Sequence, residues 1–486
     1  MKQLATLFAT VGIMCGHAAE QALAVEPVSI RVGSVAEFDA AVKQLRPGSE
    51  LVLAAGEWRD AELRFDAQGT PEQPITLRAE VPGATILTGS SRLHIGGNHL
   101  VVSGLWFRDP VTSKGDVIEF RRDSKQLAHH CRLTECAISA AKTSAPDTTE
   151  AKWLSLYGSR HRVDHCYFAG KTSAGTTAVV WLGGEPEGDH LLEHNHFGER
   201  TRLGKNGGET IRIGDSKTSD RSARCTIADN LFEHCNGETE IISNKSCDNL
   251  YTRNTFLECE GTLTLRHGHR AVVDGNWFIG HGRKLTGGVR LIGEDHRVVN
   301  NYFGGLAGEE FRCAITFMNG IPETPANGYQ QVRRAVVAFN TIADCRHPFM
   351  LGLADNSKAT LPPADCLIAA NVVYCPQSQL AEAPSDSSGV RCVGNVVQTK
   401  SLGIDLGDGI QALPFTMAAG ADRLWRASSP LPAAAKLPSE VALPLVDIDG
   451  QPRAAHPQPG CDESVDALIR HSPPSHNTTG PSWWKD

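Results

Sequence analysis

The sequence predicts an all-β protein, a right-handed parallel β-helix with a capping helix at its N-terminal end. The first observation is a recurring segment of two apolar residues, a spacer, an asparagine, one residue and an aromatic or aliphatic residue, as in HLLEHNHF and CTIADNLF. The second is its interval, a unit of 22–25 residues that inserted loops lengthen in places. Short Val/Ile strands separated by Asn and Gly turns at this interval indicate a solenoid with one coil per repeat, and the pattern of leucine-rich repeats is missing.

The asparagines of this segment form the third observation. They are Asn195, Asn230, Asn254, Asn276, Asn301, Asn340, Asn371 and Asn395, and Cys136 and Cys166 occupy the same position upstream. One asparagine per coil at the same position predicts an internal ladder, in which each side-chain amide bonds the next and satisfies backbone groups of the turn.

Composition excludes several classes of protein. The chain has 486 residues, of which 41% are hydrophobic and 21% charged, so disorder and coiled coil are not expected. A net charge of −8 provides no general basic field, which argues against nucleic acid as a partner. If the partner is a polyanion, the positive charge must be concentrated in one cleft.

The two ends of the solenoid are predicted as follows. Residues 1–24 resemble a signal peptide that ends in an A-x-A cleavage site, which predicts export to the periplasm or the medium, and no later segment is long enough to span a bilayer. Ser34 and Glu37 form a capping-box pattern, so residues 34–45 are expected to form the capping helix. Residues 25–473 are expected to form one domain, with 406–473 as an irregular extension and 474–486 as a frayed tail.

Cysteine usage gives a weaker signal. The thirteen cysteines after Cys15 contain no C-x-x-C pair and are spread along the chain, so they indicate neither a zinc site nor a dense disulfide framework. Several fall at repeat positions and are expected to be buried thiols, although one or two disulfides remain compatible with the sequence.

Strand alternation places charged residues on one outer face. In successive coils the residues expected to point outward are Arg212, Glu240, Arg266, Arg290 and Arg312. They are separated by about one coil each, which predicts a single outward column. Within it, Glu238 and Glu240 form an i, i+2 carboxylate pair, and Asn206 lies one coil back. Such oxygen ligands suit a hard cation, Ca²⁺ before Mg²⁺, and Lys245 follows in the same turn, where a lysine base would act.

Three segments, 206–214, 238–246 and 263–268, together resemble polysaccharide lyase family 6, the alginate lyase and chondroitinase B family, and the resemblance extends over about residues 27–465. It implies a Ca²⁺-dependent β-elimination in a β-helix cleft. By motif, Asn206, Glu238 and Glu240 would hold Ca²⁺, Lys245 would be the general base, and Arg266 would be the general acid or stabilise the oxyanion.

The remaining family positions carry less defined roles. Glu209 would support the metal site from behind its ligands or pair with a cation, Arg212 would bind substrate, and His267 would bind the sugar or serve a structural role. Arg270, Arg290 and Arg312 would recognise carboxylate or sulfate groups of the substrate. The loops at 196–225 and 305–335 would shape the subsites.

Several functions stay open at this point. An anionic polysaccharide is the expected partner, with alginate first and dermatan sulfate second. Both substrates stay open because the motifs do not separate them. A β-helix glycoside hydrolase would use Glu238 and Glu240 as an acid–base pair, and a non-catalytic carbohydrate-binding solenoid would need no base. The protein could be a monomer or a homodimer.

Overall fold

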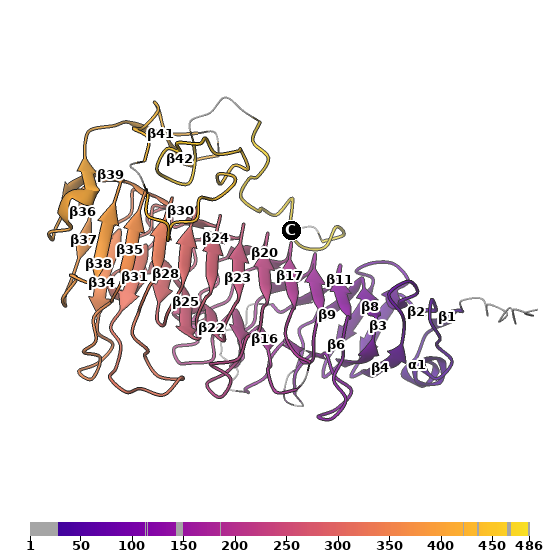
Figure 1. The fold of residues 1–486 in the computed structure, drawn as a ribbon. Helices are drawn as coiled ribbons and strands as arrows, with labels where there is room; N and C mark the ends of the chain where they lie inside the picture. Colours follow the sequence, from indigo (N-terminus) through magenta and orange to yellow (C-terminus); the bar gives the residue numbers. More distant parts are fainter. Residues whose placement is uncertain are drawn as a thin grey trace, which may run out of the picture.

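The computed structural model describes residues 28–484 except 112, 114, 142–148, 185, 421, 435–436 and 464–467, so the predicted signal peptide lies outside the described residues. The chain winds through three long sheets, strand by strand, and the strands of consecutive coils pair in parallel in all three (Figure 1). The parallel β-helix is therefore confirmed. Among the described residues, no helix is long and apolar enough to cross a bilayer.

We name the three sheets A, B and C in the order in which the chain first enters them. Sheet A contains β1 (Ser29–Val32), β2 (Glu50–Leu53), β5 (Ile75–Ala79), β8 (Leu100–Ser103), β11 (Arg132–Thr134), β14 (Arg162–Asp164), β17 (Leu191–Glu193), β20 (Thr226–Ala228), β23 (Leu250–Thr252), β26 (Val272–Asp274), β29 (Arg297–Val299), β32 (Val336–Ala338), β35 (Cys366–Ala369) and β38 (Val390–Val393). Sheet B contains β3 (Gly56–Arg59), β6 (Thr85–Thr88), β9 (Leu105–Arg108), β12 (Ala137–Ser139), β15 (Tyr167–Ala169), β18 (His196–Phe197), β21 (Leu231–Glu233), β24 (Thr255–Leu257), β27 (Trp277–Ile279), β30 (Tyr302–Gly304), β33 (Thr341–Ala343), β36 (Val372–Gln379), β39 (Asn395–Ser401) and β40 (Ile410–Ala412). Sheet C contains β4 (Glu62–Gln68), β7 (Arg92–Asn98), β10 (Ile118–Glu119), β13 (Leu154–Leu156), β16 (Ala178–Val180), β19 (Ile211–Ile213), β22 (Glu240–Lys245), β25 (Gly261–His267), β28 (Thr286–Leu291), β31 (Ile315–Met318), β34 (Phe349–Leu353) and β37 (Ala381–Glu382).

The predicted asparagine ladder is present at the turn between sheets A and B. Each asparagine Oδ1 accepts the backbone N–H and the side-chain amide of the asparagine one coil earlier, at 2.8–3.1 Å from Asn195 through to Asn395. Cys166 occupies the same position upstream, because its backbone N–H donates to Asn195 Oδ1. The ladder satisfies turn groups that would otherwise be buried without a partner.

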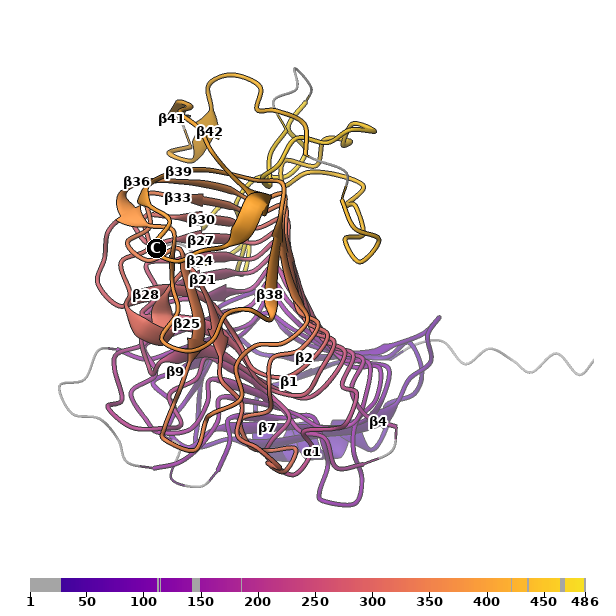
Figure 2. The same cartoon turned by 60° about the vertical axis from the view of Figure 1, so that its left-hand side comes forward.

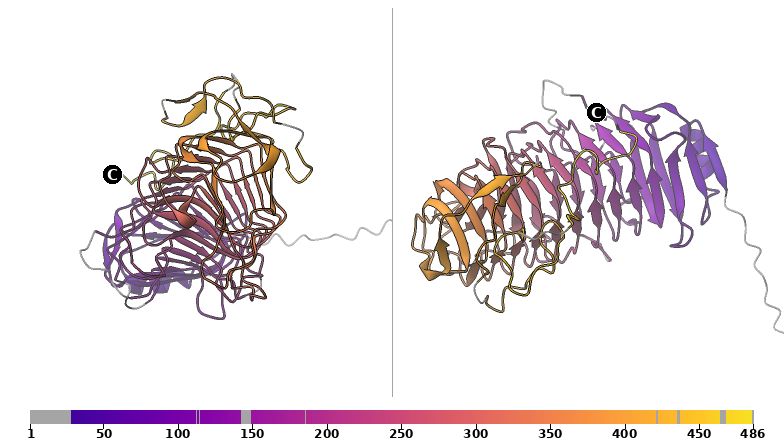
Figure 3. Two further views of the ribbon diagram at one scale, coloured as in Figure 1. Left: turned by 90° about the vertical axis from the view of Figure 1, so that its left-hand side faces the viewer. Right: turned by 90° about the horizontal axis from the view of Figure 1, so that it is seen from above.

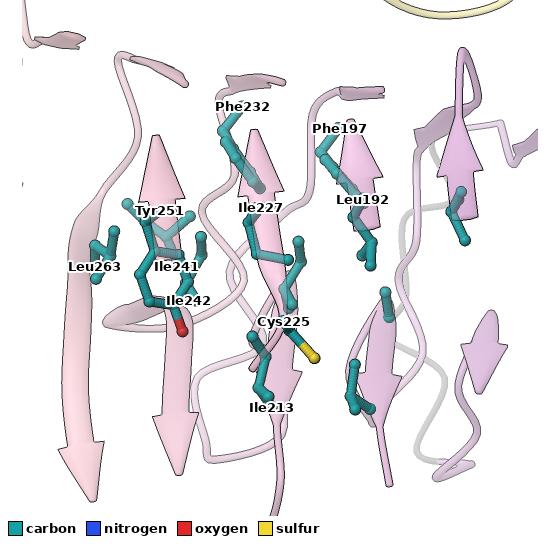
Figure 4. Packing of buried hydrophobic residues seen from close by; sticks show 14 of the residues in the cluster. Leu192, Phe197, Ile213, Cys225, Ile227, Phe232, Ile241, Ile242, Tyr251 and Leu263 are labelled. Atoms are coloured by element: carbon teal, nitrogen blue, oxygen red, sulfur yellow. The ribbon is translucent and has the colours of Figure 1, made fainter. Parts of the chain in front are cut away.

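The interior beside this ladder is filled by stacked apolar side chains. Phenylalanines of consecutive sheet B strands stack at 4.6–5.2 Å between ring centroids, and they are Phe168, Phe197, Phe232, Phe256, Phe278 and Phe303. Figure 4 shows Phe197 and Phe232 in register above Leu192 and Ile227 of sheet A and Ile213 of sheet C. All thirteen described cysteines are buried and unpaired, as expected of core thiols.

A second internal ladder lies at the turn between sheets C and A, and the sequence repeat did not reveal it. His161 Nδ1 accepts the backbone N–H of Cys131, His190 Nδ1 accepts that of His161, and His296 Nδ1 accepts that of Ala271. Asn249 serves the same purpose for Cys225. Histidine and asparagine are interchangeable in this ladder because each offers one acceptor, and their mixed use hides the period.

We expect this histidine ladder to make the protein acid-sensitive. Burial holds the pKa of His190 at about 3 and that of His296 at about 4, and it lowers the pKa of His161 well below its usual value. Because an unfolded histidine titrates near 6.5, the unfolded state binds more protons below that pH. The free energy of unfolding is therefore highest above pH 6.5. It falls as the pH drops toward 4, by about 1.4 kcal/mol per pH unit for each buried histidine. Urea midpoints at pH 7.5 and 5.5 measure the effect.

The variant His190→Asn supplies the matched control for this experiment. It keeps an acceptor at the position, as Asn249 does two coils later, and removes the titrating group. Its stability should fall less steeply between pH 7.5 and 5.5 than that of the wild type. An equal slope would mean that His190 does not contribute to the acid sensitivity.

The N-terminal end is closed by α1 (Val35–Val42), the one α-helix in the part of the chain that the structure describes. Ser34 Oγ accepts from Glu37 N, Glu37 Oε2 accepts from Gly33 N, and Phe38 and Ala41 face the core. The capping box is thus confirmed, with the helix ending three residues earlier than expected. Figure 2 shows the opposite end, where sheet B strands β21 to β39 stack along the solenoid beneath the C-terminal extension.

That extension contains η2 (Gly407–Gly409) and a hairpin of β41 (Met417–Ala419) and β42 (Trp425–Ala427), and it crosses the outside of the coils (Figure 3). The expectation of a frayed tail is wrong for residues 474–484. This segment returns along sheet B, where Trp483 and Trp484 lie against Trp106 of β9 and Trp484 lies against Tyr167 of β15 (Figure 1). Gly480 N donates to His194 O, and Trp483 Nε1 donates to Glu135 O. The sequence did not predict this docking, because the residues that the tail contacts lie more than 280 positions earlier in the chain.

Candidate functional site

A polar cleft of 550 Å³ opens on the outer face of sheet C, where β19, β22 and β25 lie side by side. Its walls bring together most of the residues that the sequence motifs single out: Asn206, Glu209, Arg212, Glu238, Glu240, Lys245, Arg266 and His267. Glu150, Lys205 and Asn327 from loops complete the rim. The motifs of three consecutive coils therefore form one site.

Three carboxylates form the acidic half of the cleft. Oxygens of Glu209, Glu238 and Glu240 all lie within 4.8 Å of one another. Glu238 Oε2 accepts the backbone N–H groups of Gly207 and Gly208, and Ser243 Oγ donates to Glu240. Burial, and then the negative charges of Glu209 and Glu240, raise the pKa of Glu238 to about 7. The cluster carries more negative charge than its surroundings neutralise.

This oxygen cluster fits a calcium ion. Ca²⁺ takes carboxylate and amide oxygens in flexible geometry, and Glu209 Oε2 is buried without a hydrogen-bond partner among the described residues. Asn206 lines the same cleft with an amide oxygen to offer. Glu209 is itself a candidate ligand, because its carboxylate lies with those of Glu238 and Glu240. The backbone N–H groups of Gly207 and Gly208, just before it, both donate to Glu238.

The predicted single column of outward charges is wrong in register. Arg212 pairs with Ser243, Ser243 with Thr264, and Thr264 with Arg290, so no acid stands in that row. The cause is a pair of β-bulges between β22 and β25, at which an extra residue re-aims the neighbouring side chains. The extra residues are Ile241, beside Glu240, and Arg266. Bulges of this kind leave no mark in strand alternation, so the sequence could not show them.

The bulges separate acids from bases along the strands. Glu240 stands at the start of β22 and Lys245 at its end, opposite His267 of β25. Arg266 bridges the two halves, since its Nε lies 3.8 Å from Glu240 Oε1 and its Nη1 lies 3.4 Å from His267 Nδ1. Burial, then the positive charges of Arg266 and Lys245, lower the pKa of His267 to about 3. This imidazole is therefore neutral at physiological pH.

Tyr329 contacts the cleft residue Arg266, and the sequence reasoning missed it. Its ring lies 4.2 Å beneath the Arg266 guanidinium, and its hydroxyl accepts a 2.8 Å hydrogen bond from Arg290 Nη2. The residue comes from the loop between β31 and β32, within the 305–335 insertion expected to shape the subsites. Arg290 is buried, and it contacts the tyrosine that in turn contacts Arg266. In the sequence, only the length of this insertion indicated that its residues would lie near the site.

Arg200 is a second residue that carried no sequence signal. It is 3% exposed and donates to the carbonyl oxygens of Glu209, at 2.6 Å, and Gly175, at 2.7 Å. Burial lowers its pKa to about 10, which leaves it charged. It therefore fixes the backbone that presents Glu209 to the carboxylate cluster.

Two predicted substrate residues lie elsewhere. Arg270 is half-exposed and forms a two-pronged ion pair with Asp248 at 2.6 and 2.9 Å, outside the residues that line the cleft. Its position in the turn between sheets C and A turns it away from the outer face of sheet C. Arg312 belongs to the short helix η1 (Glu310–Arg312) and lines an adjacent pocket of 320 Å³ together with Asn206 and Glu238.

Several known proteins are similar to this chain. The chondroitinase B family model matches residues 32–433. The PL6 family alginate lyase AlyGC is 33% identical with a TM-score of 0.84, over 94% of this chain and 59% of that one. A mannuronic acid specific family 6 lyase from human gut microbiota is 31% identical with a TM-score of 0.71, over 79% of this chain and 90% of that one.

More distant relatives share the fold of this chain. A PL6 alginate lyase in complex with a trisaccharide is 22% identical with a TM-score of 0.74, which shows a shared fold. The chain spans about three fifths of the length of AlyGC. No curated protein sequence matches. The family model covers most of the chain and two solved relatives exceed 30% identity, so this protein belongs to polysaccharide lyase family 6, the chondroitinase B family.

Proposed function

We propose that this protein is an exported lyase that cleaves a uronate-containing polysaccharide, alginate first, by calcium-assisted β-elimination. The observation that carries the proposal is the juxtaposition of Lys245 and Arg266 with three clustered carboxylates in one open cleft. Two relatives above 30% identity are an alginate lyase and a mannuronic acid specific lyase, which supports alginate. Residues 1–24 support export to the periplasm or the medium.

The reaction requires a base, charge stabilisation and a proton for the leaving group. Lys245 in its neutral form removes the proton from C5 of the uronate, the C4–C5 double bond forms, and the C4–O4 bond breaks. Arg266 beside it stabilises the negative charge that develops on the substrate oxygens. An ammonium group gives up a proton more readily than a guanidinium group, so we assign protonation of O4 to Lys245.

The carboxylates and arginines position the substrate for this step. Asn206, Glu209, Glu238 and Glu240 would hold Ca²⁺, and a bound Ca²⁺ neutralises a uronate carboxylate, which makes its C5–H more acidic. Arg212 lines the cleft and its guanidinium is held 4.9 Å from the ring centroid of Trp181. A neutral His267 can accept or donate a hydrogen bond to a sugar hydroxyl without adding charge.

Dermatan sulfate is the second candidate substrate, because the matching family model is that of chondroitinase B. Arg312, in the pocket beside the carboxylates, could pair with a sulfate as well as with a carboxylate. Ultraviolet absorbance of the unsaturated product distinguishes the two when each polymer is incubated with the enzyme in Ca²⁺ or in chelator. A calcium-dependent rise with dermatan sulfate alone would replace alginate, and shortening of either polymer without any rise would indicate a hydrolase.

The calcium site gives a prediction of its own. We expect Glu238→Gln to raise the Ca²⁺ concentration needed for half-maximal activity at least ~10-fold, because one of the three charged ligands is lost. The measurement is initial rate against free Ca²⁺ after chelation. Glu323→Gln, at an exposed position in the 305–335 loop, is the matched control and should not change the curve. Equal calcium dependence in both variants would remove Glu238 from the metal site.

A further inference from the structure

A second cluster of metal-binding side chains lies outside the cleft, on sheet B. It consists of His196 of β18, Glu233 of β21 and His476 of the C-terminal tail, whose ligand atoms all lie within 4.8 Å of one another. His196 Nε2 is 3.3 Å and His476 Nε2 is 2.9 Å from the same atom, Glu233 Oε2. The cleft is on sheet C, so this cluster plays no part in the proposed reaction.

The chemistry of the cluster is that of a transition-metal site. We infer that His196, Glu233 and His476 bind one Zn²⁺ ion or a similar divalent transition metal, which fastens the C-terminal tail to the β-helix. Two imidazole nitrogens and one carboxylate are a common protein ligand set for zinc, with water as the fourth ligand. Tetrahedral bonds of about 2.0–2.1 Å place ligand atoms about 3.3 Å apart, close to the separations observed here.

The position of His476 does not depend on the cluster itself. The tail is held by the hydrogen bond from Gly480 N to His194 O, at 2.8 Å, and by Ser482, whose N and Oγ both donate to Glu135 Oε2 at 2.7 Å. Trp484 packs 4.5 Å from the ring of Tyr167. These contacts bring His476 to the other two residues in the apo protein, so little ordering is left for the metal to impose.

The surroundings also suit a metal. His196 is 4% exposed, with its ring 5.0 Å from that of Tyr167, whereas the His476 side chain is 45% exposed. The site is therefore closed on the side of the sheet and open to solvent on the side of the tail, where a water ligand can enter.

An ordinary ion pair is the competing explanation, and its features differ. Elsewhere His347 pairs with Glu382 through one imidazole, at 2.5 Å. At Glu233, two imidazoles converge on one carboxylate oxygen with their rings 4.6 Å apart. If both imidazoles were protonated, their charges would repel each other across this short distance. A metal ion removes that repulsion, because it accepts a lone pair from all three groups.

The two sites should prefer different metals. The cleft offers only oxygen ligands and suits Ca²⁺, whereas imidazole favours Zn²⁺ and Co²⁺. The experiment therefore uses full-length protein stripped with EDTA and returned to excess Ca²⁺, which occupies the carboxylate cluster. Buried thiols do not compete, since every described cysteine is 8% exposed or less. Co²⁺ is then added as the spectroscopic probe, followed by Zn²⁺.

We expect one equivalent of Co²⁺ to give the visible bands of a four-coordinate site, Zn²⁺ to abolish them, and Zn²⁺ to raise the unfolding temperature by several degrees. His476→Ala should lose the bands and the shift, and His347→Ala, which breaks the single-imidazole pair, should keep both. Glu233→Gln, with the same shape, should lower zinc affinity at least ~10-fold. A wild type without bands, or bands that survive in His476→Ala, would overturn the inference. Lyase activity, read on the same samples, reports independently on the cleft.

Discussion

Replacement of Lys245 by alanine is expected to lower the rate of β-elimination by about 10³-fold or more while leaving the fold intact. A positioned general base contributes about 10²–10⁴-fold to a proton abstraction, and among the described residues that line the cleft no other base lies at this position. His267 is neutral but lies opposite Lys245 in the strand ladder, partly buried against the Arg266 side chain. The measurement is the initial rise in ultraviolet absorbance with alginate and Ca²⁺.

The controls separate loss of the base from loss of structure. Lys217→Ala removes an exposed lysine near the same face and should keep full activity. Lys245→Arg retains the positive charge but not the ability to accept a proton, so it should be as inactive as the alanine variant. Binding of alginate to Lys245→Ala should persist. Residual activity within tenfold of the wild type would assign the base to another residue, with His267 next in line.

The sequence determined the fold more completely than the site. The asparagine ladder was predictable because every coil repeats one chemical requirement, a partner for buried turn groups, and one residue type meets it. The histidine ladder meets the same requirement with two residue types, so no single-letter pattern marks it. The solenoid could therefore be predicted from the asparagine ladder alone.

The site was predictable only where its residues lie next to one another in the chain. Glu240 and Lys245 share β22 and Glu238 lies two residues before it, and the three motifs named most of the cleft. The register was not predictable, because the bulges at Ile241 and Arg266 depend on how β22 and β25 meet in space. Residues delivered from loops had no signal of their own, as Tyr329 illustrates. The docking of the tail had none either.

The asparagine ladder carries the second large prediction. We expect Asn254→Ala to lower the free energy of unfolding by about 3–5 kcal/mol. The substitution removes the acceptor of Asn230 N and Nδ2, at 3.1 and 2.9 Å, and the donor to Ile227 O, at 2.8 Å. All of these groups are buried in the turn, and each one left without a partner costs about 1–3 kcal/mol. Relaxation of the coil recovers part of that sum, which sets the expected range.

Urea unfolding followed by circular dichroism measures this loss, and two further variants show where it comes from. Asn356→Ala, at an exposed position, should change stability by less than about 0.5 kcal/mol. Asn254→Cys should cost less than alanine, because Cys136 serves the same ladder position and its Sγ lies 3.4 Å from Leu105 N, as an acceptor. Equal losses for alanine and cysteine would mean that the volume of the side chain, and not its acceptor, stabilises the turn. A loss no larger than that of Asn356→Ala would mean that the coils are held together by their stacked apolar core alone.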